Sequence, residues 1–137
     1  MLHTEQDVAS LVLRLTLALV IFPHGAQKLF GWFGGYGVSA TMAAFTEQMG
    51  IPGLLAFLVI LIESVGSLAL AAGAFGRVAA AGIGAVMIGA VVTTHLPYGF
   101  FMNWSGAQGG EGFEFHMLAL GIVAALAATG VETARAA

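Results

Sequence analysis

The few charged residues of this chain are separated by long apolar runs. Asp, Glu, Lys and Arg are absent from residues 15–27, 78–110 and 115–131, and residues 48–76 hold only Glu63. A helix needs about 20 predominantly apolar residues to span a bilayer. Charged residues make up only 8% of the 137 residues, too few to cover the surface of a soluble fold of this size. The sequence therefore predicts an integral membrane protein.

Four apolar segments are long enough to be membrane-spanning helices. They cover residues 8–30, 52–74, 77–96 and 112–130. Pro52 suits the start of a helix, and Gly73 and Gly76 favour a tight turn between the second and third segments. Small residues are frequent in these segments, which permits close helix packing in lipid. We expect a single domain, residues 1–137, that folds as an all-α four-helix membrane bundle.

The two longer connections hold Trp and Tyr, which favour the headgroup level of a membrane. They are residues 31–50, between the first two spans, and residues 97–111, before the fourth. We expect a short interfacial helix from Ser39 to Met49, with Ser39 as its N-cap.

Basic residues predict the orientation of the bundle. An even number of spans places both long connections on one side, where Lys28 lies, while Arg77 and Arg135 lie on the other. Cytoplasmic loops carry the excess of basic residues. We therefore expect both termini in the cytoplasm.

Two further compositional features exclude classes of function. The formal net charge is −3, without a basic stripe, which argues against a nucleic-acid partner. The chain has no cysteine, so disulfides, thiolate chemistry and Fe–S clusters are excluded within it.

Ionisable side chains inside the first two spans are the strongest candidates for a site. Such groups are costly in a bilayer and are expected to face the bundle. Helical periodicity places Arg14, His24 and Lys28 on one face, with Gln27 beside them. Counting by rise places Glu63 level with residues 17–18, about one turn from Arg14. Glu63 is then either half of a structural Arg14–Glu63 ion pair or a protonatable carboxyl in a site.

A second polar group is expected near the outer end of the bundle. His24, His95 and His116 come from three different spans, and Glu111 and Glu114 precede the fourth. Four interpretations stay open: structural histidines with satisfied hydrogen bonds, a pocket for an organic ligand, a metal centre, or b-type haem. No two histidines have the i,i+3 or i,i+4 spacing that favours a metal site. Glu111 also suits the helix N-terminus by charge.

Aromatic residues cluster in the two connections. They are Trp32, Phe33, Tyr36, Phe100, Phe101 and Trp104. They form either an interfacial belt or a lid over a flat ring ligand.

Several of these motifs together are similar to those of the DoxX family. The matching stretches are Leu13-Arg14-Leu15, Phe22-Pro23-His24-Gly25-Ala26-Gln27-Lys28-Leu29-Phe30-Gly31-Trp32-Phe33-Gly34-Gly35, Ile51-Pro52, Glu63-Ser64-Val65-Gly66-Ser67-Leu68-Ala69-Leu70, Arg77, Asn103-Trp104 and Gly110-Glu111-Gly112-Phe113-Glu114-Phe115. The resemblance implies a four-span protein of the bacterial inner membrane. The family includes small subunits of thiosulfate:quinone oxidoreductases and proteins that accompany quinone or catechol detoxification and resistance to oxidative or thiol stress.

The resemblance implies a quinone-linked redox subunit or partner as the leading hypothesis. His24, Lys28 and Glu63 are the expected catalytic residues, since they can donate to a quinone oxygen and move a proton. The other residues expected to line the ligand site are Arg14, Gln27, His95, Trp104, Glu114 and His116. No metal is expected, and electrons would come from a soluble oxidoreductase partner or directly from a bound reductant.

Two other classes of function stay open. One is proton-coupled transport or permeation of a small solute, which would require a homodimer because four spans rarely form a transporter alone. The other is a non-catalytic membrane anchor for an oxidoreductase complex, in which the polar groups only hold the bundle together.

Overall fold

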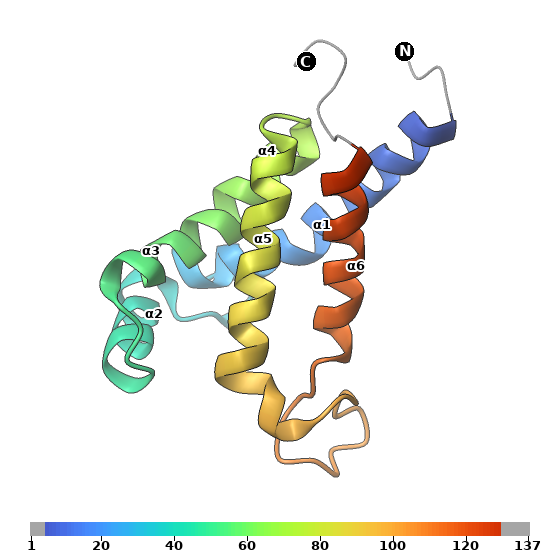
Figure 1. Ribbon diagram of the computed structural model, residues 1–137. Helices are drawn as coiled ribbons and strands as arrows, with labels where there is room; N and C mark the ends of the chain where they lie inside the picture. Colours follow the sequence, from blue (N-terminus) through green and yellow to red (C-terminus); the bar gives the residue numbers. More distant parts are fainter. Residues whose placement is uncertain (1–4, 130–137) are drawn as a thin grey trace.

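The computed structural model describes residues 5–129, which form helices, turns and loops and, within that range, no strand (Figure 1). The α-helices are α1 (Glu5–Phe30), α2 (Gly37–Ala43), α3 (Gly53–Leu61), α4 (Ser67–Ala72), α5 (Gly76–Ala90) and α6 (Glu114–Thr129). Three π-helical turns interrupt or extend them: η2 (Ala44–Gln48), η3 (Ile62–Gly66) and η4 (Val91–His95). Two short 3-10 turns, η1 (Trp32–Gly34) and η5 (Leu96–Tyr98), complete the set. The expected all-α class is confirmed.

Three helical segments are long and apolar enough to cross a membrane. They are Val8–Phe30, Gly53–Ala72 and Gly76–Tyr98. The helix α6 is apolar but has 16 residues, and Gly130, the last residue of the expected fourth span, lies outside the described range. The fourth span therefore stays a prediction.

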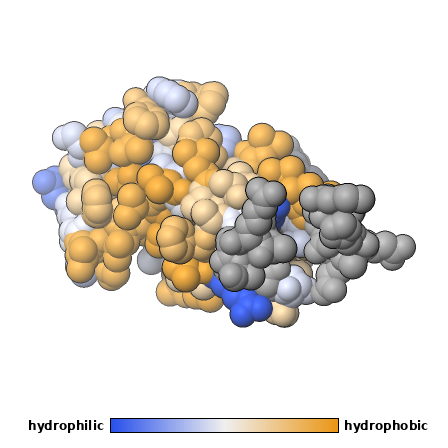
Figure 2. Space-filling view, turned by 90° about the horizontal axis from the view of Figure 1, so that it is seen from above, coloured by the Kyte–Doolittle hydropathy of each residue, from blue (hydrophilic) through white to orange (hydrophobic). Residues whose placement is uncertain are grey.

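Large apolar side chains cover the outside of the bundle. Leu19, Val78 and Leu118 are each at least two-thirds exposed, at 75%, 73% and 68%. Figure 2 looks onto the end of the bundle that carries the α4–α5 turn, and there too apolar residues make up most of the coloured surface. Water would not tolerate so continuous an apolar surface, whereas hydrocarbon chains match it.

The buried core lies between α1, α4, α5 and α6. Its largest fully buried members include Leu17 on α1, Leu70 on α4, Ile83 on α5 and Leu126 on α6. A methyl group at Gly84 would come within 3.0 Å of Val123 Cγ1, so glycine lets α5 and α6 approach closely. A small residue thus lies where α5 and α6 cross, as close packing of helices in lipid requires.

The boundaries between the helices match the expected turn chemistry in most places. Gly73 ends α4 in the left-handed region, at φ +77°, and α5 begins at Gly76. Pro52 directly precedes α3. The helix α1 continues through Pro23.

The helix expected over 39–49 differs in its start. It begins at Gly37, after Tyr36, so Ser39 lies inside the first turn and does not cap it. Gly37 has φ +79°, a conformation that glycine adopts without strain, and the chain enters the helix two residues early. The segment α2–η2 then runs continuously to Gln48.

The connections are arranged at two ends of the bundle. Figure 1 places the turn between α4 and α5 at the same end as the start of α1 and the end of α6, and the loop between α5 and α6 at the opposite end. Arg135, used in the orientation argument, lies outside the described residues.

The two ends can be tested by single cysteines, because the chain has none of its own. We expect Ser105→Cys to react with a membrane-impermeant maleimide in intact cells. Ala74→Cys should react only after the membrane is permeabilised, because the arginine excess predicts that the α4–α5 turn is cytoplasmic. Equal labelling of both variants in intact cells, with the cysteine-free parent as the background control, would contradict the arrangement.

Candidate functional site: a lysine–glutamate pair inside the bundle

An ion pair joins α1 to the middle of the second spanning segment. Lys28 Nζ donates to Glu63 Oε2 at 2.6 Å. The side chain of Glu63 is 7% exposed and that of Lys28 is 23% exposed. Charge-assisted hydrogen bonds are stronger than neutral ones, and a charge inside a membrane protein needs such a partner. The pair is therefore a fixed feature of the helix interface.

A close backbone contact positions this ion pair. A methyl group added at Gly25 would overlap the backbone of Glu63 and Ser64. The absence of a side chain at Gly25 thus allows α1 to rest directly on η3. Lys28 follows Gly25 by three residues, about one helical turn, and so lies beside Glu63.

The segment that carries Glu63 is itself specialised. Glu63 lies in the π-helical turn η3, and π turns occur frequently at functional sites. The buried hydroxyls of Ser64 and Ser67 donate to the carbonyl oxygens of Ile60 and Glu63, both at 2.6 Å. Both buried hydroxyls are therefore satisfied within their own helix.

The expected Arg14–Glu63 ion pair is wrong. Glu63 pairs with Lys28, and its backbone lies against Gly25 rather than level with residues 17–18. The reason is that α1 runs obliquely across the bundle (Figure 1), so equal counts of residues do not give equal depth. Arg14 is buried, at 7% exposure, and its Nε and Nη1 atoms have no hydrogen-bond partner among residues 5–129.

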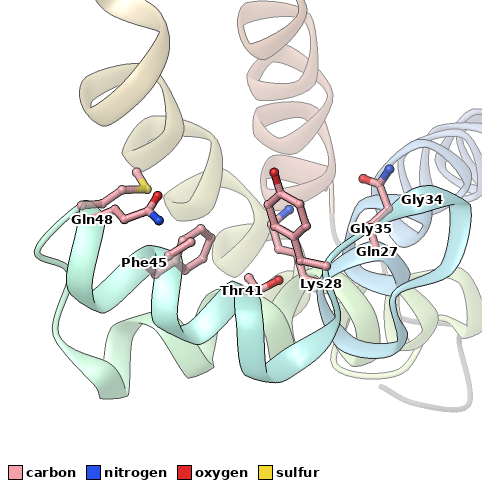
Figure 3. Close-up of a pocket in the computed structure, with 10 residues that line it drawn as sticks. Gln27, Lys28, Gly34, Gly35, Thr41, Phe45 and Gln48 are labelled. Carbon is pink, nitrogen blue, oxygen red and sulfur yellow. The ribbon is translucent and has the colours of Figure 1, made fainter.

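A cavity of about 440 Å³ lies next to the ion pair (Figure 3). Gln27 and Lys28 contribute from α1, Gly34 and Gly35 from the following turn, and the remaining lining residues come from Tyr36 and the α2–η2 segment. These remaining residues are Tyr36, Thr41, Ala44, Phe45, Gln48 and Met49. Figure 3 shows Thr41, Phe45 and Gln48 on one wall, with Lys28 behind them. The cavity thus presents a cation and two aromatic rings within a largely apolar wall.

Sequence reasoning placed Gln27 and Lys28 in the site but missed most of this wall. Thr41, Phe45 and Gln48 were not named as site residues, although the apolar spacing of Phe45 and Met49 marks one face of the helix. Gly35 packs against Gln27 so closely that a methyl group there would overlap the Gln27 backbone. The Gly34-Gly35 pair is the signal that could have shown the connection folding back on α1.

The three histidines of the second polar group lie near one another but form no ligand set. The rings of His95 and His116 are 4.3 Å apart between centroids. His116 also interacts electrostatically with His24, which in turn interacts with Lys28 and Glu63. His24 is exposed, whereas His116 is buried and its Nδ1 has no partner within the described range. In that range no three His, Asp or Glu side chains have the geometry to hold a metal ion.

The two glutamates before α6 have separate surroundings. Glu111 accepts a hydrogen bond from the backbone N–H of Asn103, and its own carbonyl oxygen lies 2.8 Å from His95 Nδ1. Glu114 lines a different cavity, together with Trp104. The structure therefore does not bring Glu114 and Trp104 to the Lys28–Glu63 pair.

Comparison with known proteins identifies the family of this chain. The DoxX family model matches residues 9–96, a segment that contains Gly25, Lys28 and Glu63. The chain belongs to the DoxX family. Together with its long apolar helices, this establishes a DoxX-like membrane protein.

One curated relative of this DoxX protein is from Bacillus subtilis (strain 168). It is named "Putative oxidoreductase CatD" and is 26% identical over 97 residues, which cover 71% of this chain and 67% of the relative. No solved structure matches the chain.

The close contact at Gly25 can be tested by adding one methyl group. We expect Gly25→Ala to lower the free energy of unfolding by about 1–3 kcal/mol, because α1 and η3 must separate. Gly121→Ala is the matched control, since a methyl group there meets no other atom within 4 Å. Thermal unfolding in detergent checks both. Equal stability of the two variants would show that the helices do not touch at Gly25.

The ion pair can be tested by a double-mutant cycle. We expect Lys28→Met or Glu63→Leu alone to cost about 3 kcal/mol, because each leaves a charge without its partner in an apolar interface. The double variant should recover most of that loss. Unfolding free energies of the four proteins check the coupling, and purely additive losses would contradict it.

Proposed function

We propose that this DoxX protein is a quinone-binding subunit or partner of a membrane-associated oxidoreductase. The observation that carries the proposal is the ion-paired lysine at the wall of a cavity between the end of α1 and the α2–η2 segment, whose lining includes two aromatic rings. A cavity of about 440 Å³ falls in the range of small-molecule sites. The name of the Bacillus relative supports a redox role.

Lys28 is the residue best suited to hold a quinone oxygen. An ammonium group has three N–H donors, and among the described residues Glu63 accepts from one of them. The other donors are free to meet a carbonyl oxygen of a ring placed in the cavity. Tyr36 and Phe45 supply aromatic surface for that ring.

Lys28 and Glu63 can also stabilise charge and transfer a proton while a bound quinone is reduced. Two electrons and two protons convert a quinone into a quinol. Negative charge that develops on the quinone oxygen is stabilised by the Lys28 ammonium. Lys28 can give one proton to that oxygen and regain a proton from the exposed His24, which takes it up from water, while the Glu63 carboxylate favours the charged form of Lys28. The second proton reaches the other quinone oxygen from water. The electrons come from the associated oxidoreductase.

We also propose a location for this reaction. The protein lies in the bacterial inner membrane with both termini in the cytoplasm. The cavity is then at the outer end of α1, since Lys28 is in the last turn of that helix.

Photolabelling with an azidoquinone tests the proposal. We expect saturable labelling of the purified protein within residues 27–49, and about tenfold weaker labelling of Glu63→Gln, because a hydrogen bond between charged groups is worth roughly 1.5–3 kcal/mol. His24→Ala should label several-fold less. Glu111→Gln is the matched carboxylate control and should label as the parent does.

Equal labelling of the parent, Glu63→Gln and His24→Ala would overturn quinone binding at this site. It would favour the anchor hypothesis, in which the ion pair has only a structural role. Thermal unfolding of each variant confirms that the labelled proteins are folded.

A further inference from the structure

A second cavity, of about 620 Å³, lies where the loop over 97–113 meets the start of α6. It shares no lining residue with the cavity beside Lys28. Three aromatic rings and two methionines line it, together with one carboxylate: Phe100, Trp104, Phe115, Met102, Met117 and Glu114. The proposed quinone site does not use this space.

Glu114 is the charged group of this cavity. It is half-buried, and its Oε1 atom accepts a 3.3 Å hydrogen bond from the backbone N–H of Met102. Among the described residues Oε2 has no hydrogen-bond partner of its own. A cationic ligand that enters the cavity can therefore pair with this carboxylate.

The walls of the cavity are held in place by hydrogen bonds. The Glu114 N–H donates to the Phe100 carbonyl at 2.8 Å, and the Gly112 N–H donates to the Phe101 carbonyl at 3.1 Å. Further along the loop, the Gln108 N–H donates to Asn103 Oδ1 at 2.8 Å. These hydrogen bonds fix the backbone of the loop against the start of α6, so the segments that carry Phe100, Met102 and Glu114 keep their relative positions.

We propose that this cavity binds an organic ammonium ion that carries an apolar group. The ammonium lies at Glu114 and against the rings of Trp104 and the neighbouring phenylalanines. Aromatic faces attract cations, and ammonium groups are the ligands that aromatic cages recognise. A metal ion is a poor match because hard cations need several oxygen ligands, and the cavity supplies one carboxylate. The methionines and rings accept the apolar part of the ligand.

Two sources share this chemistry. Trp104 is 85% exposed at the loop end of the bundle, where tryptophan favours the headgroup level. The ammonium could therefore belong to a lipid headgroup such as ethanolamine, or to a free hydrophobic amine.

Fluorescence of Trp104 provides the test. In Trp32→Phe protein, Trp104 is the single tryptophan. We titrate phenylethylammonium into this protein in nanodiscs of phosphatidylglycerol, and we use 2-phenylethanol as the neutral analogue with the same ring. We expect a saturable fluorescence change with the ammonium, at a midpoint at least tenfold lower than any change with the alcohol.

Matched variants assign the effect to the cavity. Glu114→Gln keeps an oxygen that can accept from Met102 and should raise the midpoint at least tenfold, whereas Glu111→Gln should leave it unchanged. Phe115→Leu keeps apolar volume and should raise the midpoint several-fold. Equal midpoints for the ammonium and the alcohol, or for Glu114→Gln and Glu111→Gln, would overturn the proposal.

A second lipid composition distinguishes the two sources of the ammonium group. If the native ligand is a headgroup, nanodiscs that contain phosphatidylethanolamine should raise the phenylethylammonium midpoint, because the lipid competes. If a free amine is the ligand, the midpoint should be the same in both lipids. Either result supports ammonium binding and assigns its source.

Discussion

The contact between the backbones of α1 and η3 at Gly25 is the constraint on which the site depends. Lipid gives helices no hydrophobic reason to associate, so close approach and polar contacts must hold them together. Gly25 provides the approach, and it also sets the lateral position of Lys28 against Glu63. The cavity beside Lys28 then forms because the Gly34-Gly35 turn folds the α2–η2 segment back over α1. Gly25 therefore links helix packing to charge pairing, and the Gly34-Gly35 turn determines the shape of the candidate binding site.

Much of the fold could be read from the spacing of charged residues. Long runs with few charges located the three helices that are long and apolar enough to span a membrane, and the turn at Gly73 followed from glycine chemistry. The partner of Glu63 could not be read in this way. Counting rise per residue assumes parallel helices, and α1 is inclined, so Glu63 lies beside Gly25 instead of one turn from Arg14. Inclination is set by packing at both ends of a helix, and a single sequence does not encode it locally.

The candidate site was predicted in part for a similar reason. His24, Lys28 and Glu63 were selected from their charge and their resemblance to family motifs, and the structure brings Lys28 and Glu63 into contact. Glu114 and His116 are two residues apart on α6, about 200° around the helix, and they accordingly face different surroundings. Assigning both to one site joined two separate features, a histidine pair and an aromatic cavity. Thr41, Phe45 and Gln48 form a wall of the cavity because the connection after α1 folds back on that helix. The helical periodicity of a sequence does not predict the path of such a connection.

The π-helical turn at Ile62–Gly66 has a consequence for how this protein can change over evolution. A π turn contains one residue more than the α-helical turn it replaces. The side chains before and after it therefore do not continue one regular helical periodicity. Removing one residue there would restore a regular helix, but it would rotate everything beyond the turn by about 100° relative to α3. The number of residues between Ile60 and Leu70, both fully buried, is thus constrained as tightly as their identity. Related chains should vary in side chains along this segment far more readily than in its length.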